Sequence, residues 1–180
     1  MLSNYDAKGV AEVLGLERAS KKGKAKEANV RSIASKIDDE FVTYVGHVAV
    51  RIVKWSPSPV FIEKAVESGL PRESLRHVAQ IIAGGDKAKA SALERGVVPK
   101  TTLERRANKL SLQESERTER IARLFVHARR ALGSEAEARE FMTAPHPELD
   151  GRNPVEAAKT DLGTRRTEQI LNALEYGLAL

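Results

Sequence analysis

The first sixty residues carry no long helical pattern. A short helix is predicted within 6–16, and the stretch 15–31 is rich in Lys, Ala and Gly without an apolar period, which is typical of a flexible or weakly helical basic linker. The run FVTYVGHVAVRIV at 41–53 is dense in β-branched residues, so a strand is predicted there, although its apolar pattern also fits a helix. The sequence WSPSP at 55–59 then interrupts regular structure, because each proline fixes φ and restricts the residue before it.

After this break, apolar residues recur at the three- and four-residue spacing of helices. The segment 60–69 places Phe61, Ala65 and Val66 on one face and is expected to end at Gly69. The segment 71–85 opens on a proline, a residue favoured in the first turn of a helix. Its apolar stripe is predicted at Leu75, Val78, Ala79 and Ile82.

Capping residues mark the ends of the next helices. Asp86 is expected to cap a helix that Gly96 ends. Ser111 and Glu114 have the spacing of a capping box, at the start of a long helix that Gly133 closes. The buried stripe of this long helix is predicted at Ile121, Leu124, Phe125, Ala128 and Leu132.

Three further helix starts are predicted, one before and two after a turn-rich loop at 143–154. Ser134 with Glu137 repeats the start signal, and Asn153 followed by Pro154 is typical of an N-cap and first helical residue. Asp161 is expected to cap the last helix. The buried face of this last helix is predicted at Thr167, Ile170, Leu171 and Leu174, with Gly177 after its end.

A helix before Gly96 and a second helix after Pro99 form a helix-turn-helix candidate. With Leu103 at the centre of the buried face, the second helix also turns Ala107 and Leu110 inward. Arginine can read guanine, asparagine can read adenine, and threonine or lysine can hold phosphate, but an exposed basic helix is also compatible with a merely solvated surface. The residues predicted to contact DNA are Thr101, Arg105, Arg106, Asn108 and Lys109.

The net charge of +5 is unevenly distributed. Residues 1–60 hold ten Lys/Arg against seven Asp/Glu, and residues 61–110 hold ten against six. Residues 141–180 hold four against six. A basic first part suits a polyanionic partner, which favours the DNA interpretation, and an acidic end suits a different partner.

The residue types argue against catalysis and metal binding. The chain has no cysteine, which excludes disulfides and Cys-ligated zinc, and its four histidines follow no ligand spacing. His77 and His127 are expected to make polar contacts between helices. No run approaches the roughly 20 apolar residues of a membrane span. We therefore expect a cytoplasmic protein that is no enzyme and has no catalytic residue, metal site or cofactor.

Two stretches resemble one known family. Residues 100–134, KTTLERRANKLSLQESERTERIARLFVHARRALGS, are similar to the Xre-type antitoxins that are paired with RES-domain toxins, and residues 140–180 resemble the toxin-binding domain of Xre/MbcA/ParS antitoxins. Phe141 stands where that family favours Trp, His146 where Asn is common, and Gly96 one place before the usual turn glycine. The matching positions in the second stretch are Pro145, Leu149, Gly151, Pro154, Gly163, Leu171, Leu174, Tyr176 and Gly177.

This resemblance implies an antitoxin with three parts: an N-terminal extension over 1–60 that is a candidate dimerisation element, an Xre-like helix-turn-helix domain over 61–133, and a toxin-binding domain over 134–180. The implied partners are a co-encoded, NAD⁺-consuming RES toxin and operator DNA, with the chain as a homodimer or in a higher hetero-oligomer with its toxin. It adds Lys100 and Thr102 to the DNA-contacting residues. The implied toxin-binding residues are Arg152, Arg165, Arg166, Tyr176, Gly177, Leu178 and Leu180.

The last residues, EYGLAL, combine an aromatic ring, a glycine and a terminal carboxylate. Such a tail suits a toxin pocket that normally holds a dinucleotide phosphate, and a frayed terminus without a role is the alternative. Two rival hypotheses remain for the whole chain. One is a stand-alone helix-turn-helix regulator without a toxin, and the other is an interaction protein that has lost DNA binding.

Overall fold

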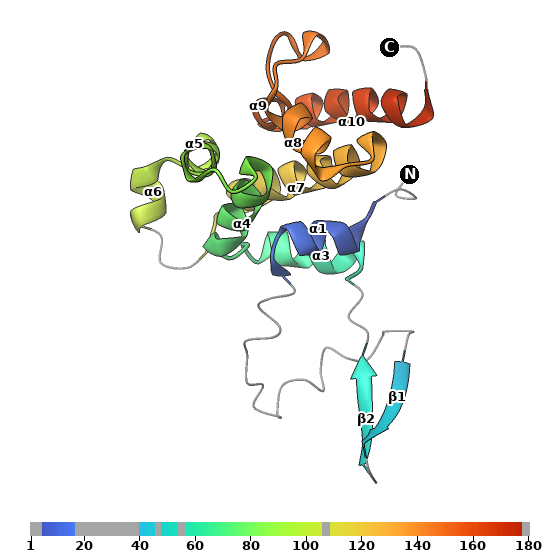
Figure 1. The fold of residues 1–180 in the computed structure, drawn as a ribbon. Coiled ribbons are helices and arrows are strands. Elements are labelled where there is room, and N and C mark those ends of the chain that lie inside the picture. Colours follow the sequence, from blue (N-terminus) through green and yellow to red (C-terminus); the bar gives the residue numbers. More distant parts are fainter. Residues whose placement is uncertain (1–4, 17–39, 46–47, 54–56, 106–108, 178–180) are drawn as a thin grey trace.

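The computed structural model describes residues 5–16, 40–45, 48–53, 57–105 and 109–177. This part of the chain is mainly helical, as predicted (Figure 1). In chain order the elements are α1 (Ala7–Val13), β1 (Glu40–Val45), β2 (Val48–Val53), α3 (Pro59–Glu67), α4 (Arg72–Ala83), α5 (Lys87–Val97), α6 (Lys100–Arg105), α7 (Leu112–Leu132), α8 (Glu135–Thr143), the 3-10 turn η2 (Pro147–Leu149), α9 (Pro154–Ala157) and α10 (Asp161–Tyr176).

The strand predicted for 41–53 is present as two strands. β1 and β2 pair antiparallel, with Glu40 opposite Val53 at one end and Val45 opposite Val48 at the other. The basic linker predicted for 15–31 lies, from residue 17 onward, outside the described residues.

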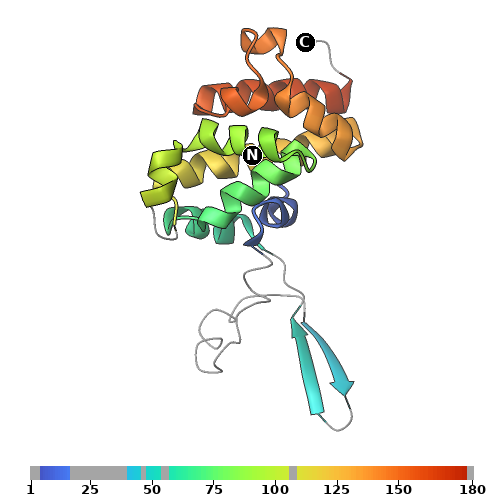
Figure 2. The same ribbon diagram turned by 60° about the vertical axis from the view of Figure 1, so that its left-hand side comes forward.

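Helix α7 is the element around which the other helices pack. It contacts α1, α3, α4 and α5 on one side of the molecule and α8, α9 and α10 on the other. Figures 1 and 2 show it running through the middle of the helical body, with α10 lying along it. One cluster of buried apolar side chains extends from Val10 of α1 through Phe125 of α7 to Leu171 of α10. The core therefore joins both ends of the chain.

Most predicted helix starts are confirmed by their hydrogen bonds. Asp86 Oδ1 accepts the amide hydrogens of Ala88 and Lys89 at 2.8 and 3.1 Å. Ser111 and Glu114 form the capping box at the start of α7. Ser134 and Asn153 cap α8 and α9 in the same way, each accepting the amide hydrogen of the residue three places later. Such a cap stabilises a helix by about 1 kcal/mol.

The predicted role of Gly96 is wrong. Gly96 lies inside the last turn of α5, the helix ends at Val97, and the C-cap residue Val98 is extended. Pro99 is the reason, because a proline forces the residue before it out of the helical conformation.

The second helix of the candidate helix-turn-helix is shorter than predicted. The described residues of α6 are Lys100–Arg105, and Lys109 and Leu110, which the prediction placed in this helix, are not helical. The amide of Leu110 donates to Leu70 O at 2.9 Å, and Lys109 forms a β-bridge with Pro71. The backbone of Lys109 and Leu110 is thus bonded to the connection between α3 and α4, so it does not form the hydrogen bonds of an α6 helix.

The cap of α10 is Thr160, not Asp161 as predicted. Thr160 Oγ1 accepts the amide hydrogen of Gly163 at 3.1 Å, and Asp161 is the first helical residue. This register places Gly163 where α10 approaches α9 most closely, since a Cβ added there would lie 2.1 Å from Ala157 O.

Two predicted buried faces are partly wrong. In α3 the buried residues are Ile62 and Val66, and the predicted Phe61 is 38% exposed. Phe61 and Ile62 are adjacent apolar residues, about 100° apart on a helix, so the pattern fits either face. In α10 the predicted Leu174 is 44% exposed and Ala173 is buried in the last turn. The apolar stripe of α4 is buried as predicted.

Candidate functional site

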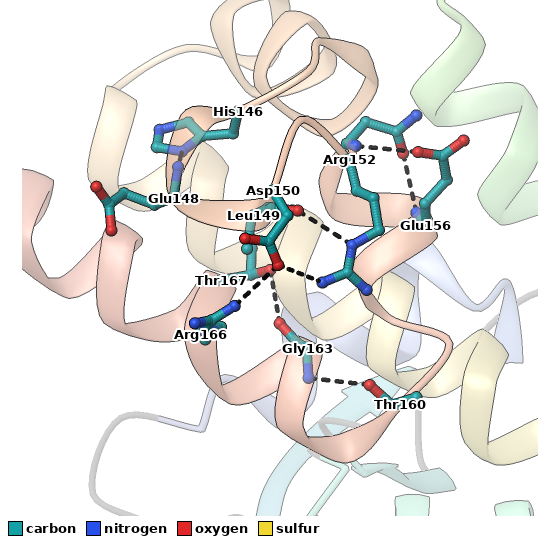
Figure 3. A network of polar contacts seen from close by, with 11 residues as sticks. His146, Glu148, Leu149, Asp150, Arg152, Glu156, Thr160, Gly163, Arg166 and Thr167 are labelled. Atoms are coloured by element: carbon teal, nitrogen blue, oxygen red, sulfur yellow. Dashed lines mark hydrogen bonds and ion pairs between the residues drawn. The ribbon is translucent and has the colours of Figure 1, made fainter.

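The loop between α8 and α9 is a tight turn built around a histidine. His146 Nδ1 accepts the amide hydrogen of Glu148 at 3.2 Å, and His146 O accepts the amides of Leu149 and Gly151. Asp150 has a φ of +57° and Gly151 a φ of +75°, so two successive residues adopt the left-handed conformation. That conformation is unusual for a residue with a side chain. The turn directs the Asp150 carboxylate toward α10 (Figure 3).

The Asp150 carboxylate is shared by two arginines. Oδ2 lies 3.5 Å from Arg152 Nη2 and 3.3 Å from Arg166 Nη1, and Arg152 Nε donates to Leu149 O at 3.0 Å (Figure 3). All three charged side chains are largely exposed, so the attraction between them is weak. Because Arg152 and Arg166 carry two positive charges and Asp150 one negative charge, this group of side chains has a net charge of about +1. The loop and α10 thus bring the predicted residues Arg152 and Arg166 together.

The first turns of α10 are fixed against α9. Gly163 allows the close approach to Ala157, and Thr167 Oγ1, which is buried, donates to Gly163 O at 2.9 Å. Thr164 Oγ1 donates to Thr160 O at 2.9 Å in the same way. Arg165 lies on the opposite side of α10 from these contacts, Arg166 lies between the two sides, and both arginines are exposed. The tight packing of α10 on α9 therefore holds the part of the helix that carries both arginines.

We call the solvent side of this helix the outer face of α10. Its members are spaced by three, four or seven residues, which places them on one side of a helix. Leu162 is 76% exposed and Tyr176 58% exposed, at opposite ends of the face. Leu162 was not among the predicted residues, although its spacing from the arginines could have identified it. The outer face consists of Leu162, Arg165, Arg166, Gln169 and Tyr176.

The last turn of α10 is tied to α7 by a charged contact. Arg130 Nε and Nη2 donate to Glu175 Oε1 and Oε2 at 2.8 and 2.9 Å, and His127 Nε2 lies 3.2 Å from Oε2. Hydrogen bonding from Arg130 lowers the pKa of Glu175, and burial lowers the pKa of His127. This cluster of His127, Arg130 and Glu175 is called the α10 clamp below. It confirms the predicted interhelical role of His127.

A second polar chain lies about two helical turns earlier on α7. Tyr5 Oη donates to Glu119 Oε1 at 2.8 Å, and Arg123 pairs with Glu119 at 3.4 Å and with Glu168 of α10 at 2.9 Å. Burial raises the pKa of Tyr5 and of Glu119. His77, also predicted to make an interhelical contact, has its Nδ1 3.0 Å from Val13 O at the end of α1.

On the other side of the molecule, α5 and α6 form two helices joined by a short turn. Only Val98 and Pro99 separate them, and Thr102 N donates to Pro99 O at 2.9 Å. Arg117 of α7 donates from Nη1 to Gly96 O at 2.7 Å. Burial lowers the pKa of Arg117. The guanidinium group of Arg117 therefore caps the end of α5 and holds the turn against α7.

The structure places only part of the predicted DNA-contacting set. Lys100, Thr101 and Thr102 lie together in the first turn of α6, with the first two exposed. Lys109 follows the helix, and its Nζ donates to Ser68 O at 3.0 Å, so its predicted place on the outward side of α6 is wrong. Arg105 lies at the end of α6, and Arg106 and Asn108 are outside the described residues.

Of the predicted toxin-binding residues, five lie within the described residues. Arg152, Arg165, Arg166 and Tyr176 are placed as above, and Gly177 ends α10 with a φ of +62°. Leu178 and Leu180 are outside the described residues.

Within the described ranges, no three His, Cys, Asp or Glu side chains are grouped so that they could hold a metal ion. No helix described there has the length and hydropathy to cross a membrane.

Comparison with known proteins assigns one part of this architecture. The family model described as the antitoxin Xre/MbcA/ParS C-terminal toxin-binding domain matches residues 127–177. Among curated proteins, none matches the chain. The matched range begins at His127 in the second half of α7 and ends at Gly177, so it includes the α10 clamp, the α8–α9 loop and the outer face of α10. Residues 127–177 are therefore assigned to the Xre/MbcA/ParS C-terminal toxin-binding domain family.

Proposed function

We propose that the chain neutralises a co-encoded RES-type toxin, an enzyme that consumes NAD⁺, by covering the active site of that toxin. The observation that carries this proposal is the family match over 127–177, because that range holds the exposed arginines and the aromatic residue of the outer face of α10. The protein itself performs no chemistry in this function. It acts in the cytoplasm by binding.

The toxin contacts the outer face of α10, the loop around Arg152 and the C-terminal residues that follow. Exposed Leu162 and Tyr176 supply apolar contact area, and the arginines are suited to bidentate pairing with carboxylates of the partner. Tyr176 and Gly177 direct the tail with Leu178 and Leu180 into the cleft in which the toxin binds NAD⁺. This tail then excludes the dinucleotide.

We propose further that α5 and α6 form a DNA-binding helix-turn-helix that represses the operon. The exposed first turn of α6 presents Lys100 and Thr101 next to Thr102, and the sequence continues with Arg105, Arg106 and Asn108. Lys109 is exposed beside this segment and serves as a phosphate contact. The basic balance of residues 61–110 supports a polyanionic partner.

The proposed division of labour is an N-terminal extension over 1–60 that promotes dimerisation, a DNA-binding domain over 61–133 and a toxin-binding domain over 134–180. A homodimer would bind two operator half-sites, since helix-turn-helix dimers match the symmetry of their operators. The toxin joins this dimer in a higher hetero-oligomer.

The test is expression of the product of the neighbouring open reading frame, with and without this chain, in cells whose growth and NAD⁺ content are followed. We expect loss of NAD⁺ and growth arrest with the neighbouring product alone, and recovery of both when this chain is present. A neighbouring product that leaves growth and NAD⁺ unchanged would instead favour the stand-alone transcription regulator. That regulator would bind a palindromic operator tightly without a toxin.

A further inference from the structure

The last turn of α10 is ordered by charge rather than by apolar packing. Its large apolar side chains, Leu174 and Tyr176, are exposed, and its buried member is the small Ala173. Helix ends that lack packing usually fray. Here both oxygens of Glu175 are bound, in a bidentate contact with Arg130 and a further contact with His127. The α10 clamp therefore ties this turn to α7.

The position of Glu175 is unfavourable for the helix on its own. The C-terminus of a helix carries a partial negative charge, so an acidic side chain in the last turn destabilises it. No basic residue lies in the last turn of α10 to offset this. An acidic residue at this position is explained by its contact with α7 and not by helix propensity.

We propose that the α10 clamp aims the end of the chain at the toxin, with Glu175 as a positioning residue. Tyr176 and Gly177 follow directly, and Gly177 ends the helix in a left-handed conformation, with its amide donating to Ala173 O. The clamp thereby holds the end of α10 in place before the toxin binds, which reduces the conformational entropy lost on binding. This inference rests on the proposed function, in which these last residues contact the toxin.

The same pair of helices provides a matched control. Glu168 lies seven residues, about two helical turns, before Glu175 and pairs with Arg123 of α7 at 2.9 Å. Glu168→Gln and Glu175→Gln thus each remove one carboxylate from an α7–α10 ion pair. Glu168 is remote from the C-terminal end of α10, so only the second substitution should affect the direction of the tail.

The experiment measures two properties of the full-length variants. Amide hydrogen exchange on the free chain should be faster at residues 173–177 in Glu175→Gln and unchanged there in Glu168→Gln. Calorimetric titration with the neighbouring gene product should show affinity weakened by about tenfold for Glu175→Gln, which is 1.4 kcal/mol, and changed by less than about twofold for Glu168→Gln. Equal exchange rates at 173–177 in the two variants, or equal affinities, would overturn the proposal.

A charge reversal separates positioning from direct contact. The double variant Arg130→Glu with Glu175→Arg restores an ion pair between α7 and α10 with exchanged partners, so it should recover much of the lost affinity. If Glu175 instead contacts the toxin itself, the double variant will bind as weakly as the single one, and the positioning role fails.

Tyr176→Ala distinguishes failure of this inference from failure of the proposed function. Weaker toxin binding by Tyr176→Ala together with unchanged binding by Glu175→Gln would overturn only the positioning role. Unchanged binding by both variants would overturn the positioning role and remove the end of α10 from the toxin interface, whereas a wild-type chain that does not bind the neighbouring gene product would overturn the proposed function itself.

Discussion

At the scale of single residues, the two exposed surfaces differ in how their side chains are held. The outer face of α10 is supported from behind by backbone packing between Gly163 and Ala157. The α5–α6 turn is supported by one long side chain, that of Arg117, which reaches Gly96 O at 2.7 Å. A rigid backbone holds a binding surface more firmly than one flexible side chain does. Substitutions should therefore affect the two surfaces in different ways.

Gly163→Ala should destabilise the fold by at least about 2 kcal/mol, because the added methyl group would overlap Ala157 O and α10 would have to move away from α9. The measurement is urea unfolding followed by circular dichroism. Gly96→Ala is the matched control: this helical glycine in α5 has open space around it, and alanine is the better helix former, so stability should rise by about 0.5 kcal/mol. Equal effects of the two substitutions would refute this account of the α9–α10 contact.

Arg105→Ala should reduce sequence preference in DNA binding by about 1–3 kcal/mol if this side chain reads a base. Fluorescence anisotropy with operator and scrambled duplexes, at several salt concentrations, measures this preference. Arg95→Ala is the control, since Arg95 is an exposed arginine near the end of α5 whose Nε donates to Ser91 O at 3.0 Å. A variant at Arg105 that still prefers the operator as strongly as the wild type would show that α6 does not read it in the proposed register.

At the scale of elements, the helix starts could be predicted from sequence because they depend on local chemistry. Asp86, Ser111, Ser134 and Asn153 each bond to amides two or three residues away, and no distant part of the chain is needed for this. Where two caps compete, tertiary contact decides. Thr160 and Asp161 are both good caps, and in the structure Thr160 is the cap, with Gly163 packed closely against α9.

The candidate site was predictable to a similar degree. The family resemblance pointed to the arginines of α10, but the sharing of Asp150 by Arg152 and Arg166 depends on a turn with two left-handed residues, one of which is not glycine. The length of α6 depends on backbone bonds from Lys109 and Leu110 to the α3–α4 connection, which no local pattern reveals. Leu174 follows the apolar spacing of α10 but is exposed. Apolar spacing alone does not bury a side chain, because another part of the chain must also pack against it.

The polar contacts of Glu119 on α7 with Tyr5 and Arg123 predict a pH dependence of stability. Burial raises the pKa of Glu119, so the folded state retains this proton at a pH at which the unfolded chain has lost it. The stabilisation is complete below the ordinary Glu pKa of 4.5 and is lost as the pH rises through the raised value. The free energy of unfolding should therefore fall over this range. In Glu119→Gln the side chain cannot ionise, so the free energy of unfolding, measured by urea unfolding between pH 4 and pH 7, should fall less with pH than in the wild type. The same pH dependence of this free energy in both proteins would contradict the prediction.

At the scale of the whole molecule, the family match and the hydrophobic core do not end at the same place. The match begins at His127, in the middle of α7, whereas the main core continues through α7 to α1, α3 and α4. Phe125, Leu124 and Ile121 are fully or almost fully buried just before the matched range. The toxin-binding domain thus shares its central helix with the part proposed to bind DNA.

A fragment of residues 134–177 should consequently be poorly folded, because it lacks the α7 side of the core. A fragment of residues 111–177 retains α7 and should show more helix and a more cooperative thermal transition in circular dichroism. The full chain serves as the reference for both. An equally cooperative transition in the shorter fragment would show that α8, α9 and α10 form an independent core.

The 21 residues of α7 extend over about 31 Å without interruption. A rod of this length turns a small tilt into a large displacement: a rotation of 10° at one end moves the other end by about 5 Å. If toxin binding fixes the angle between two copies at their α10 ends, the distance between their α6 helices is fixed as well. In the proposed complex, the spacing of operator half-sites would then depend on the toxin bound at the other end of the molecule.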